Sequence, residues 1–562
     1  VQECESIGAA PALSMQRIVP IYPATKGLSQ PLLRALLDQA LRRTAQATED
    51  ALPAAIREAR RLMPAAEARR ARHFPHTQRD ADEARRRSTY EELFVLQLLL
   101  AMRRRLLHDT AVGTALDVGA DALDAFCAGL PFEPTGAQQR VLQAVAADLA
   151  AERPALRLVH GDVGSGKTAI AAFALLCGVR AGRQAAFMAP TEILAEQHRR
   201  VLEGLLKPFH VRPVLLTGSL PARDKDRIRA GLAAGDISLI IGTHALVQEA
   251  TQFADLAVAV VDEQHRFGVL QRAELAGKGR RPHLLVMTAT PIPRTLALVL
   301  YGDCDISVLD ELPSGRRPPL TVLLRKPDRD SAYRAVLEAV GKGQQAFIVC
   351  PLIEESESLQ ADAARQRHEA LSQGLLQGLR VGLLHGKLRP DIGASVVGKF
   401  RNRELDVLVA TTVIEVGMDV PNATLMLIED AERFGLAQLH QLRGRVGRGA
   451  DRGTCYLITA ATHDDPAWER LSLLEGTADG FEVAEADLRL RGPGELIGTR
   501  QTGLPDLRAA DLLADTPLIA LARDDAFALL AGDPTLSRPE HTLLRHLIHH
   551  RIPTLLPLMR GD

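Results

Sequence analysis

Two hydrophobic patterns divide the chain. From residue 32 to about 107, Leu and Ala recur at the spacing of a helix face among many charged residues. The strongest segment is 91–107, where Leu93, Leu96, Leu100 and Leu107 fall on one stripe and 103–105 are arginines. This pattern predicts a helical region. Ahead of it, residues 16–21 form a short strand-like run before a proline.

Beyond about residue 130, short apolar runs alternate with helical segments. The first series predicts strands at 156–159, 185–188, 214–216, 239–241, 257–261 and 284–287. Such alternation predicts a parallel sheet covered by helices on both faces. The run Pro-Ser-Gly-Arg-Arg-Pro-Pro at 313–319 then interrupts the pattern and predicts a linker between domains.

A second series of the same kind follows the linker. It predicts strands at 346–350, 381–384, 407–410, 424–428 and 454–458, and beyond about 461 the pattern is helical with a Gly-rich insert at 492–503. The expected fold class is α/β, with two tandem parallel-sheet domains between an N-terminal helical region and a C-terminal helical module. The expected segments are 1–24, 25–129, 130–315, 316–460 and 461–562.

Composition narrows the function classes. The 562 residues carry a net charge of −1, so no global basic field indicates a nucleic-acid partner, and any polyanion site must be a local groove. The six cysteines stand singly without a Cys-x-x-Cys pair, which argues against zinc and disulfides and favours a reducing cytosol. No apolar run approaches the roughly 18–20 residues that span a bilayer, and no signal peptide is evident.

The strongest chemical motif is Gly-Asp-Val-Gly-Ser-Gly-Lys-Thr at 161–168. It fits G-x-x-x-x-G-K-[ST] and lies between a predicted strand and a predicted helix at 169–177, the setting that a phosphate loop requires. Backbone N–H groups and the helix N-terminus would hold the phosphates of ATP or GTP. Lys167 would pair with phosphate oxygens and Thr168 would ligate Mg²⁺. The residues expected to line the nucleotide are Gly161, Gly164, Ser165, Gly166, Lys167 and Thr168.

An acidic pair, Asp262 and Glu263, ends the predicted strand 257–261. A carboxylate there can hold Mg²⁺ through water, and its neighbour can orient and deprotonate the attacking water. Alone, such a pair is usually an ordinary loop, but its place about a hundred residues after a phosphate loop favours the catalytic interpretation. Thr288-Ala289-Thr290 follows the next strand and is either a relay of the phosphate state or a plain turn.

The second strong motif is Gln-Leu-Arg-Gly-Arg-Val-Gly-Arg-Gly at 441–449. Guanidinium groups of Arg445 and Arg448, with Gln441 beside them, can neutralise charge on a transferring phosphoryl group. Because only the first of the two domains has a phosphate loop, we expect one nucleotide bound between two lobes. Hydrolysis would then depend on lobe closure. The alternative is a basic surface loop.

These motifs, in this order, resemble those of superfamily-two helicases and translocases, whose two motor domains are RecA-like. The resemblance implies that Gln138 reads the adenine edge, with Phe132 as a stacking candidate, and that Gly417 and Asp419 couple ATP to the DNA groove. The residues that it implies in strand contact are Thr191, Thr243, His244, His385 and Thr411.

Other segments narrow the resemblance to the RecG family of branched-DNA helicases. They are Asp-Glu-Gln-His-Arg-Phe-Gly at 262–268, Thr-Pro-Ile-Pro-Arg-Thr at 290–295, Glu-Arg-Phe-Gly at 432–435 and Tyr-Pro-Ala-Thr-Lys-Gly-Leu-Ser at 22–29. Residues 480–503 resemble the translocation hairpin that this family shares with transcription-repair coupling factors. There, Arg491, Arg500 and Gln501 would couple motor closure to movement on duplex DNA.

The resemblance implies an ATP- and Mg²⁺-dependent DNA helicase that moves on double-stranded DNA. It would regress stalled forks and migrate Holliday junctions in DNA repair and recombination, in helicase and isomerase reactions. It also implies branched and double-stranded DNA and single-stranded DNA-binding protein as partners, no membrane, a monomer, and the bacterial cytoplasm at the nucleoid. An aromatic content of 4% suits a motor that grips phosphates rather than stacking on bases.

One departure and two alternatives accompany this interpretation. RecG proteins carry an N-terminal oligonucleotide-fold wedge, of which we expect only the tail, residues 1–24, in this chain. The chain also begins with Val rather than Met, as a fragment or processed form would. One alternative is the motor of a transcription-repair coupling factor, which would need a polymerase-binding module upstream. The other is a non-catalytic junction-binding scaffold with a nucleotide switch.

Overall fold

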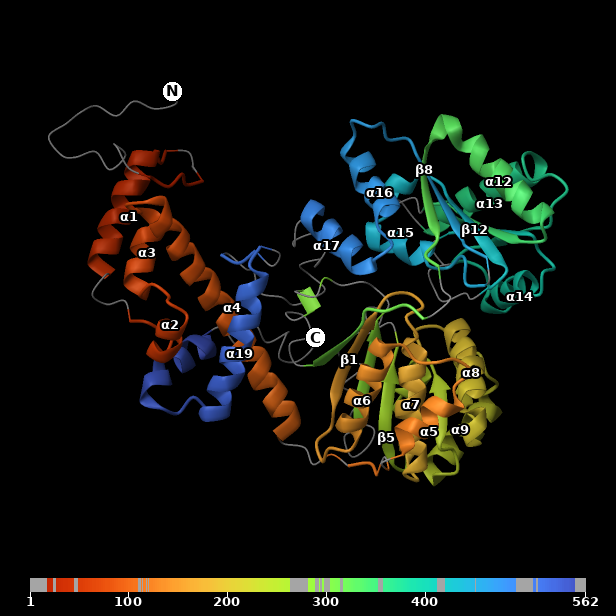
Figure 1. The fold of residues 1–562 in the computed structure, drawn as a ribbon, viewed down its shortest axis with the longest axis horizontal. Helices are drawn as coiled ribbons and strands as arrows, with labels where there is room; N and C mark the ends of the chain where they lie inside the picture. Colours follow the sequence, from red (N-terminus) through yellow and green to blue (C-terminus); the bar gives the residue numbers. More distant parts are fainter. Residues whose placement is uncertain are drawn as a thin grey trace. The chain divides into compact units, whose positions relative to one another are not determined.

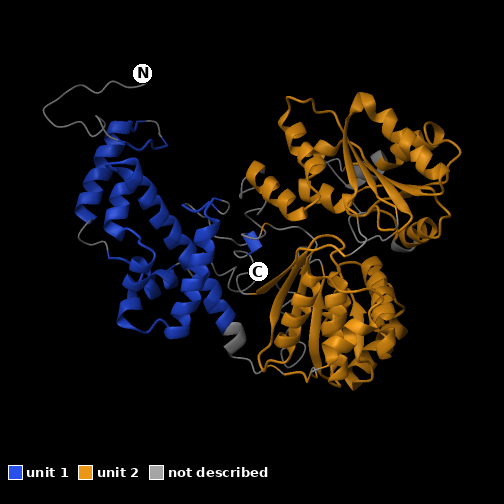
Figure 2. Ribbon diagram, in the orientation of Figure 1, with its two compact units in different colours: residues 1–107, 295–303, 493–562 blue, residues 108–294, 304–492 orange. Residues whose placement is uncertain are grey.

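The fold was examined in a computed structural model (Figure 1). It describes residues 18–23, 27–44, 49–109, 113, 115–117, 119, 121–262, 282–288, 293, 296–297, 304–313, 317–351, 357–411, 420–449, 451–491, 509–511 and 514–550. The chain divides into two compact units (Figure 2). Unit 1 comprises residues 1–107, 295–303 and 493–562, and unit 2 comprises residues 108–294 and 304–492.

Unit 1 is helical and joins segments from both ends of the chain. Its helices are α1 (Gln30–Thr44), α2 (Ala54–Ala59), α3 (Ala65–His73), α4 (Gln78–Asp109) and α19 (Thr516–Gly532). Arg60 forms a bidentate ion pair with Asp525 of α19, and the hydroxyl of Thr89 donates to the carbonyl oxygen of Ala509. The predicted helical region is confirmed, but α4 is buried around most of its circumference near residues 93–101 rather than along one stripe.

The arginine-rich run 57–87 serves structure at several positions. Arg87 is fully buried and pairs with Asp50 and Glu91. Arg79 makes an i,i+4 pair with Glu83 on an exposed face. At these positions the arginines pair with carboxylates of the same helical unit.

Unit 2 contains two lobes, each built on a parallel sheet. The first lobe has seven strands in the order β3-β4-β2-β5-β6-β1-β7. They are β1 (Leu156–Gly161), β2 (Gln184–Met188), β3 (Val214–Leu216), β4 (Leu239–Gly242), β5 (Leu256–Val261), β6 (His283–Thr288) and β7 (Asp305–Leu309). The helices of this lobe are α5 (Ala122–Gly129), α6 (Gly136–Leu149), α7 (Lys167–Arg180), α8 (Glu192–Leu206) and α9 (Ala222–Ala234).

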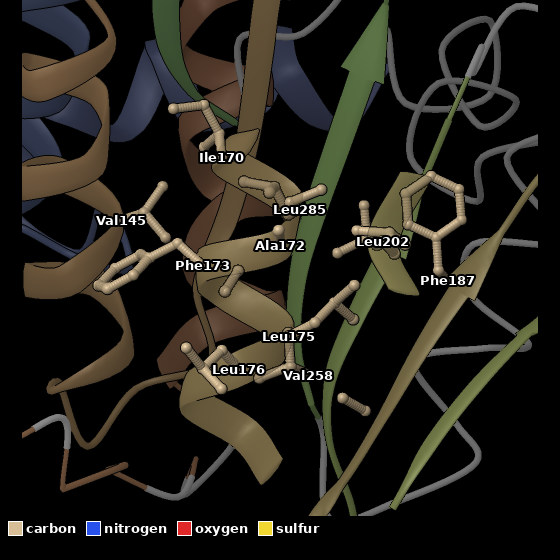
Figure 3. Close-up of a cluster of buried hydrophobic side chains, with 14 of the residues drawn as sticks. Val145, Ile170, Ala172, Phe173, Leu175, Leu176, Phe187, Leu202, Val258 and Leu285 are labelled. Atoms are coloured by element: carbon tan, nitrogen blue, oxygen red, sulfur yellow. The ribbon is translucent and has the colours of Figure 1, made fainter. Parts of the chain in front are cut away.

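Helix α7 lies at the centre of the first lobe's core. Its sequence is apolar on nearly every face, and Ala169–Cys177 is buried throughout. Figure 3 shows Ile170, Phe173 and Leu176 of this helix among side chains of the neighbouring strands and helices. This burial fixes the helix that begins directly at the phosphate loop.

The second lobe has six parallel strands in the order β10-β11-β9-β12-β13-β8. Its strands are β8 (Leu320–Arg325), β9 (Gln345–Val349), β10 (Val381–Leu384), β11 (Val407–Ala410), β12 (Ala423–Ile428) and β13 (Thr454–Thr459). Its helices are α12 (Arg329–Gly341), α13 (Glu357–Gln373), α14 (Pro390–Arg401), α15 (Leu436–Arg443), α16 (Pro466–Gly476) and α17 (Gly480–Arg491). Phe347 and Val349 of β9 join one core cluster, while Ala346 and Ile348 join another, so helices cover both faces.

The expected pair of parallel sheets is confirmed, with two differences in detail. Strands β7 and β8 were not predicted, and they flank the predicted linker 313–319. Residues 18–21 of the strand-like run have no regular structure. The domain boundaries stay a prediction, and the insert 492–503 lies outside the described residues. Among the described helices, none is both long and apolar enough to cross a lipid bilayer.

Candidate active site

The predicted phosphate loop connects β1 to α7 at the carboxyl edge of the first sheet. Gly164 and Gly166 have φ angles of 78° and 86°, in the left-handed region that favours glycine. Lys167 is the first residue of α7, and its Nζ donates to the carbonyl oxygens of Gly161 (2.7 Å) and Asp162 (2.8 Å). The loop therefore has the form, and the lysine the position, that binding of a triphosphate requires.

Gln138 ties the start of α6 to this loop. Its Oε1 accepts from the backbone of Thr135 while the hydroxyl of Thr135 accepts from the backbone of Gln138, a reciprocal capping box. Its Nε2 donates to the carbonyl oxygen of Ser165 at 2.8 Å. A Cβ on Gly166 would lie 2.1 Å from the same Nε2, so a side chain there would displace Gln138.

Gln138 and Phe132 are the two residues predicted to contact adenine. Gln138 is fully buried and uses both of its amide atoms within the protein. Phe132 is 41% exposed in the turn before α6, where its ring is accessible for stacking. The role of each residue toward adenine stays a prediction.

The acidic residue at the end of β5 is held by a histidine. The Oδ2 atom of Asp262 lies 2.7 Å from Nε2 of His198, which comes from α8, and both side chains are largely buried. The ring of His198 packs on Phe187 of β2. His198 was not predicted; the only sequence signal is its place on the buried face of an amphipathic helix that follows a strand.

The expected magnesium ligands are oxygen atoms at one edge of the sheet. Thr168 is in the first turn of α7 and Asp262 follows β5, and oxygen donors with several retained waters suit Mg²⁺. Within the described ranges, no group of three or more His, Cys, Asp or Glu side chains could hold a metal ion. The hydroxyl of Thr168 and the carboxylate of Asp262 are oxygen donors that fit a hydrated Mg²⁺ shared with phosphate. Glu263 lies outside the described residues.

The predicted arginine motif of the second lobe lies against the phosphate loop. Helix α15 ends at Arg443, and a Cβ on the next residue, Gly444, would lie 2.9 Å from Cβ of Val163. Glycine thus allows the two backbones to approach. Arg445 is buried beside this contact, and Nε of Arg448 donates to the carbonyl oxygen of Gly444.

Two residues that the sequence did not single out join the lobes directly. Nε2 of His440 lies 2.7 Å from Oδ1 of Asp162, and Nδ1 of His440 lies 2.7 Å from Nη2 of Arg443. The pKa of the Asp162 carboxyl is lowered: burial alone would raise it, but the hydrogen bonds from His440 and the amide of Val163 and the charge of Lys167 outweigh burial.

The other predicted residues follow strand ends. Thr191 caps α8 after β2, Thr243 and His244 follow β4, His385 follows β10 and Thr411 follows β11. The carboxyl edge of a parallel sheet is where such folds bind ligands, so these positions agree with a binding role. Gln441 is buried in α15, and Arg491 is the last residue of α17. Besides Glu263, the predicted residues that lie outside the described ranges are Thr290, Gly417, Asp419, Arg500 and Gln501.

Comparison with known proteins agrees with this geometry. Family models match for the DEAD/DEAH box helicase (residues 135–299), the helicase conserved C-terminal domain (331–450) and domain 3, C-terminal, of ATP-dependent DNA helicase RecG (477–552). The chain is 45% identical over 520 residues to ATP-dependent DNA helicase RecG of Synechocystis, covering 92% of this chain and 62% of the relative. It is 42% identical over 528 residues to the Bacillus subtilis protein of that name, covering 94% and 77%.

A solved structure of a RecG protein is also similar to this chain. The structure of RecG bound to a three-way DNA junction is similar with a TM-score of 0.70 and 41% identity, over 90% of this chain and 66% of that one. The chain therefore spans 62% to 77% of the length of these relatives. On its sequence, its two sheets and the placement of its phosphate loop, the chain belongs to the ATP-dependent DNA helicase RecG family.

Proposed function

We propose that this chain is a DNA-dependent ATPase that turns closure of its two lobes into movement along double-stranded DNA, and so remodels branched DNA in repair and recombination. The observation that carries the proposal is the approach of Gly444 to Val163, which places the arginine motif of one lobe against the phosphate loop of the other. A site that needs both lobes makes hydrolysis depend on their relative position.

The chain's own groups divide the work of hydrolysis. Lys167 and the amides that open α7 bind the phosphates, and Arg445 and Arg448 stabilise the charge that develops on the transferring phosphoryl group. Thr168, and Asp262 through water, would hold Mg²⁺, with His198 aligning the Asp262 carboxylate; the bound ion would neutralise phosphate charge. Glu263 takes the proton of the attacking water.

The DNA side of the proposal rests on family membership and on the strand-end residues. A relative at 41% identity has been solved on a three-way junction, and the same class of substrate is proposed here. Membership in the RecG family argues against a coupling-factor motor. We further propose a monomer that acts in the bacterial cytoplasm at the nucleoid, with single-stranded DNA-binding protein as a partner.

Phosphate release from ATP tests this function. Turnover is measured without DNA and with forked, linear duplex and single-stranded DNA, for the natural chain and for Lys167→Ala and Glu263→Gln. We expect stimulation by forked and duplex DNA, and loss of at least about a hundredfold in turnover in both variants. DNA binding without phosphate release would instead support the scaffold interpretation, and unchanged turnover in either variant would contradict the site assignment.

A further inference from the structure

A chain of hydrogen bonds runs from the phosphate loop through the second lobe. Asp162 accepts from His440, and Nδ1 of His440 meets Nη2 of Arg443. Nη1 of Arg443 donates to the carbonyl oxygens of Leu474 (2.7 Å) and Thr477 (2.8 Å). These two carbonyls belong to the end of α16 and the segment that leads into α17.

The partners of His440 define how its ring is used. Arg443 can only donate, so Nδ1 of His440 must accept. Nε2 then carries the hydrogen and donates to the Asp162 carboxylate, which can only accept. One tautomer satisfies both contacts, and it makes the ring a directional bridge between the two charged groups.

Asp162 is the residue at which this bridge meets the nucleotide site. Its carbonyl oxygen accepts from Nζ of Lys167, while its carboxylate accepts from His440. Phosphate bound by Lys167 would compete for the same ammonium hydrogens. The nucleotide and the second lobe therefore act on two ends of one residue.

Helix α17 also contacts β1, the strand that leads into the phosphate loop. The ring of Phe481, in its first turn, lies 4.6 Å from the ring of His160 in an edge-on arrangement. His160 is the residue of β1 just before the phosphate loop, and its side chain is buried. Two contacts therefore hold the start of α17. One runs through Arg443 to His440, and the other is the ring contact with His160.

These contacts lie beside a cavity of about 530 Å³, which Asp162 and Phe481 line. Carboxylates face this cavity from both lobes. They are Asp310 and Glu311 after β7, and Asp479, Glu482 and Glu485 in and before α17. Arg140 pairs with Asp310 and Glu311, and Arg489 pairs with Glu485, so these charges are partly compensated on each side of the cavity. The hydrogen bond of His440 to Asp162 lies beside the cavity and joins the two lobes.

We propose that His440 is a positioning residue that transmits the state of the phosphate loop, through Asp162 and Arg443, to the start of α17. The inference rests on the proposed function for its role in the motor, because α17 leads into the segment expected to couple hydrolysis to movement. It does not touch the reacting atoms. Its effect is on coupling between ATP turnover and DNA.

A double-mutant cycle tests this with the full chain. The ratio of phosphate release with and without forked DNA is measured for His440→Ala, Asp162→Ala and the double variant. Each single change should lower the ratio about tenfold, the worth of a hydrogen bond to a charged group, and the double variant should lose no more than either. The turnover number should fall more than KM for ATP rises. Asp162→Asn, which keeps an acceptor oxygen, should recover most of the ratio.

The control is His368→Ala, which removes a half-buried histidine of the second lobe that is hydrogen-bonded to the carbonyl oxygen of Val381. It should keep the ratio of the natural chain. Losses that add in the double variant, a change in KM alone, or a ratio unaffected by His440→Ala would each overturn the proposal.

A second measurement separates failure of this inference from failure of the proposed function. Amide hydrogen exchange of residues 477–485 is followed with and without ADP, in the absence of DNA. In the natural chain ADP should change the protection of this segment, and in His440→Ala it should not. An equal response in both proteins overturns the relay even if ATP turnover proves independent of DNA.

Discussion

Nε2 of Gln138 donates to the carbonyl oxygen of Ser165 at 2.8 Å, and Oε1 of the same buried side chain accepts from the backbone of Thr135 in the capping box of α6. The residue expected to face adenine thus also holds the phosphate loop in shape. A change at Gln138 should therefore affect both the stability of the lobe and the affinity for ATP.

We expect Gln138→Ala to lower the stability of the first lobe by about 1 kcal/mol or more, because it removes the side-chain acceptor of the capping box and leaves the Ser165 carbonyl without this donor. KM for ATP should rise as the loop loses its tether. Thermal unfolding and ATP titration measure the two effects. The exposed neighbour Gln139 provides the control, since Gln139→Ala should change neither quantity. Equal melting temperatures and equal KM values for the two variants would contradict a role of Gln138 in holding the phosphate loop.

The contact of His198 with Asp262 predicts a metal-dependent defect. His198→Ala should raise the Mg²⁺ concentration needed for half-maximal ATP turnover about tenfold, because the carboxylate loses the group that orients it. His198→Gln retains an amide donor, so its half-saturating Mg²⁺ concentration should lie between those of the natural chain and of His198→Ala. A magnesium titration of phosphate release checks this, and an unchanged half-saturation concentration would remove His198 from the account.

The lowered pKa of Asp162 predicts a pH window for stability. A carboxyl whose folded-state pKa is depressed stabilises the fold above its unfolded-state pKa, and this contribution is lost as pH falls through the folded value. The difference in apparent melting temperature between the natural chain and Asp162→Asn should be constant above about pH 5 and shrink below about pH 4. A difference that grows on acidification would show the opposite sign.

Arg500, in the expected translocation segment, should separate hydrolysis from movement. Arg500→Ala should still hydrolyse ATP in the presence of DNA but fail to move or unwind a junction, because coupling rather than chemistry is lost. The same preparation is assayed for phosphate release and for junction unwinding, in a form of the protein that carries an N-terminal wedge domain. Normal unwinding by the variant would argue against the coupling role.

The fold was largely predictable because the central strands carry continuous apolar runs and the loops between them carry motifs. The two strands that were missed, β7 and β8, each pair with a single neighbour at a sheet edge. Edge strands are exposed along one side, so their sequences, Asp-Ile-Ser-Val-Leu and Leu-Thr-Val-Leu-Leu-Arg, mix polar and apolar residues and lack the buried-run signal.

The site was predictable where chemistry is local in sequence, as in the phosphate loop and the arginine motif. It was not predictable where a residue acts through a distant partner. His198 and His440 contact residues 64 and 278 positions away, and in the sequence each is a single histidine in an otherwise ordinary helix. Only the packing of the helices on the sheets brings these rings to Asp262 and Asp162.

The central claim is ATP-driven movement along duplex DNA, and displacement of a third strand from a DNA triplex measures it directly. A motor that travels on the duplex removes the third strand without unwinding the two beneath it. We expect the natural chain to release the third strand only with hydrolysable ATP, and Lys167→Ala to release none, while the control Lys225→Ala, at a half-buried lysine outside the phosphate loop, behaves like the natural chain. ATP hydrolysis stimulated by DNA without any release of the third strand would contradict the account.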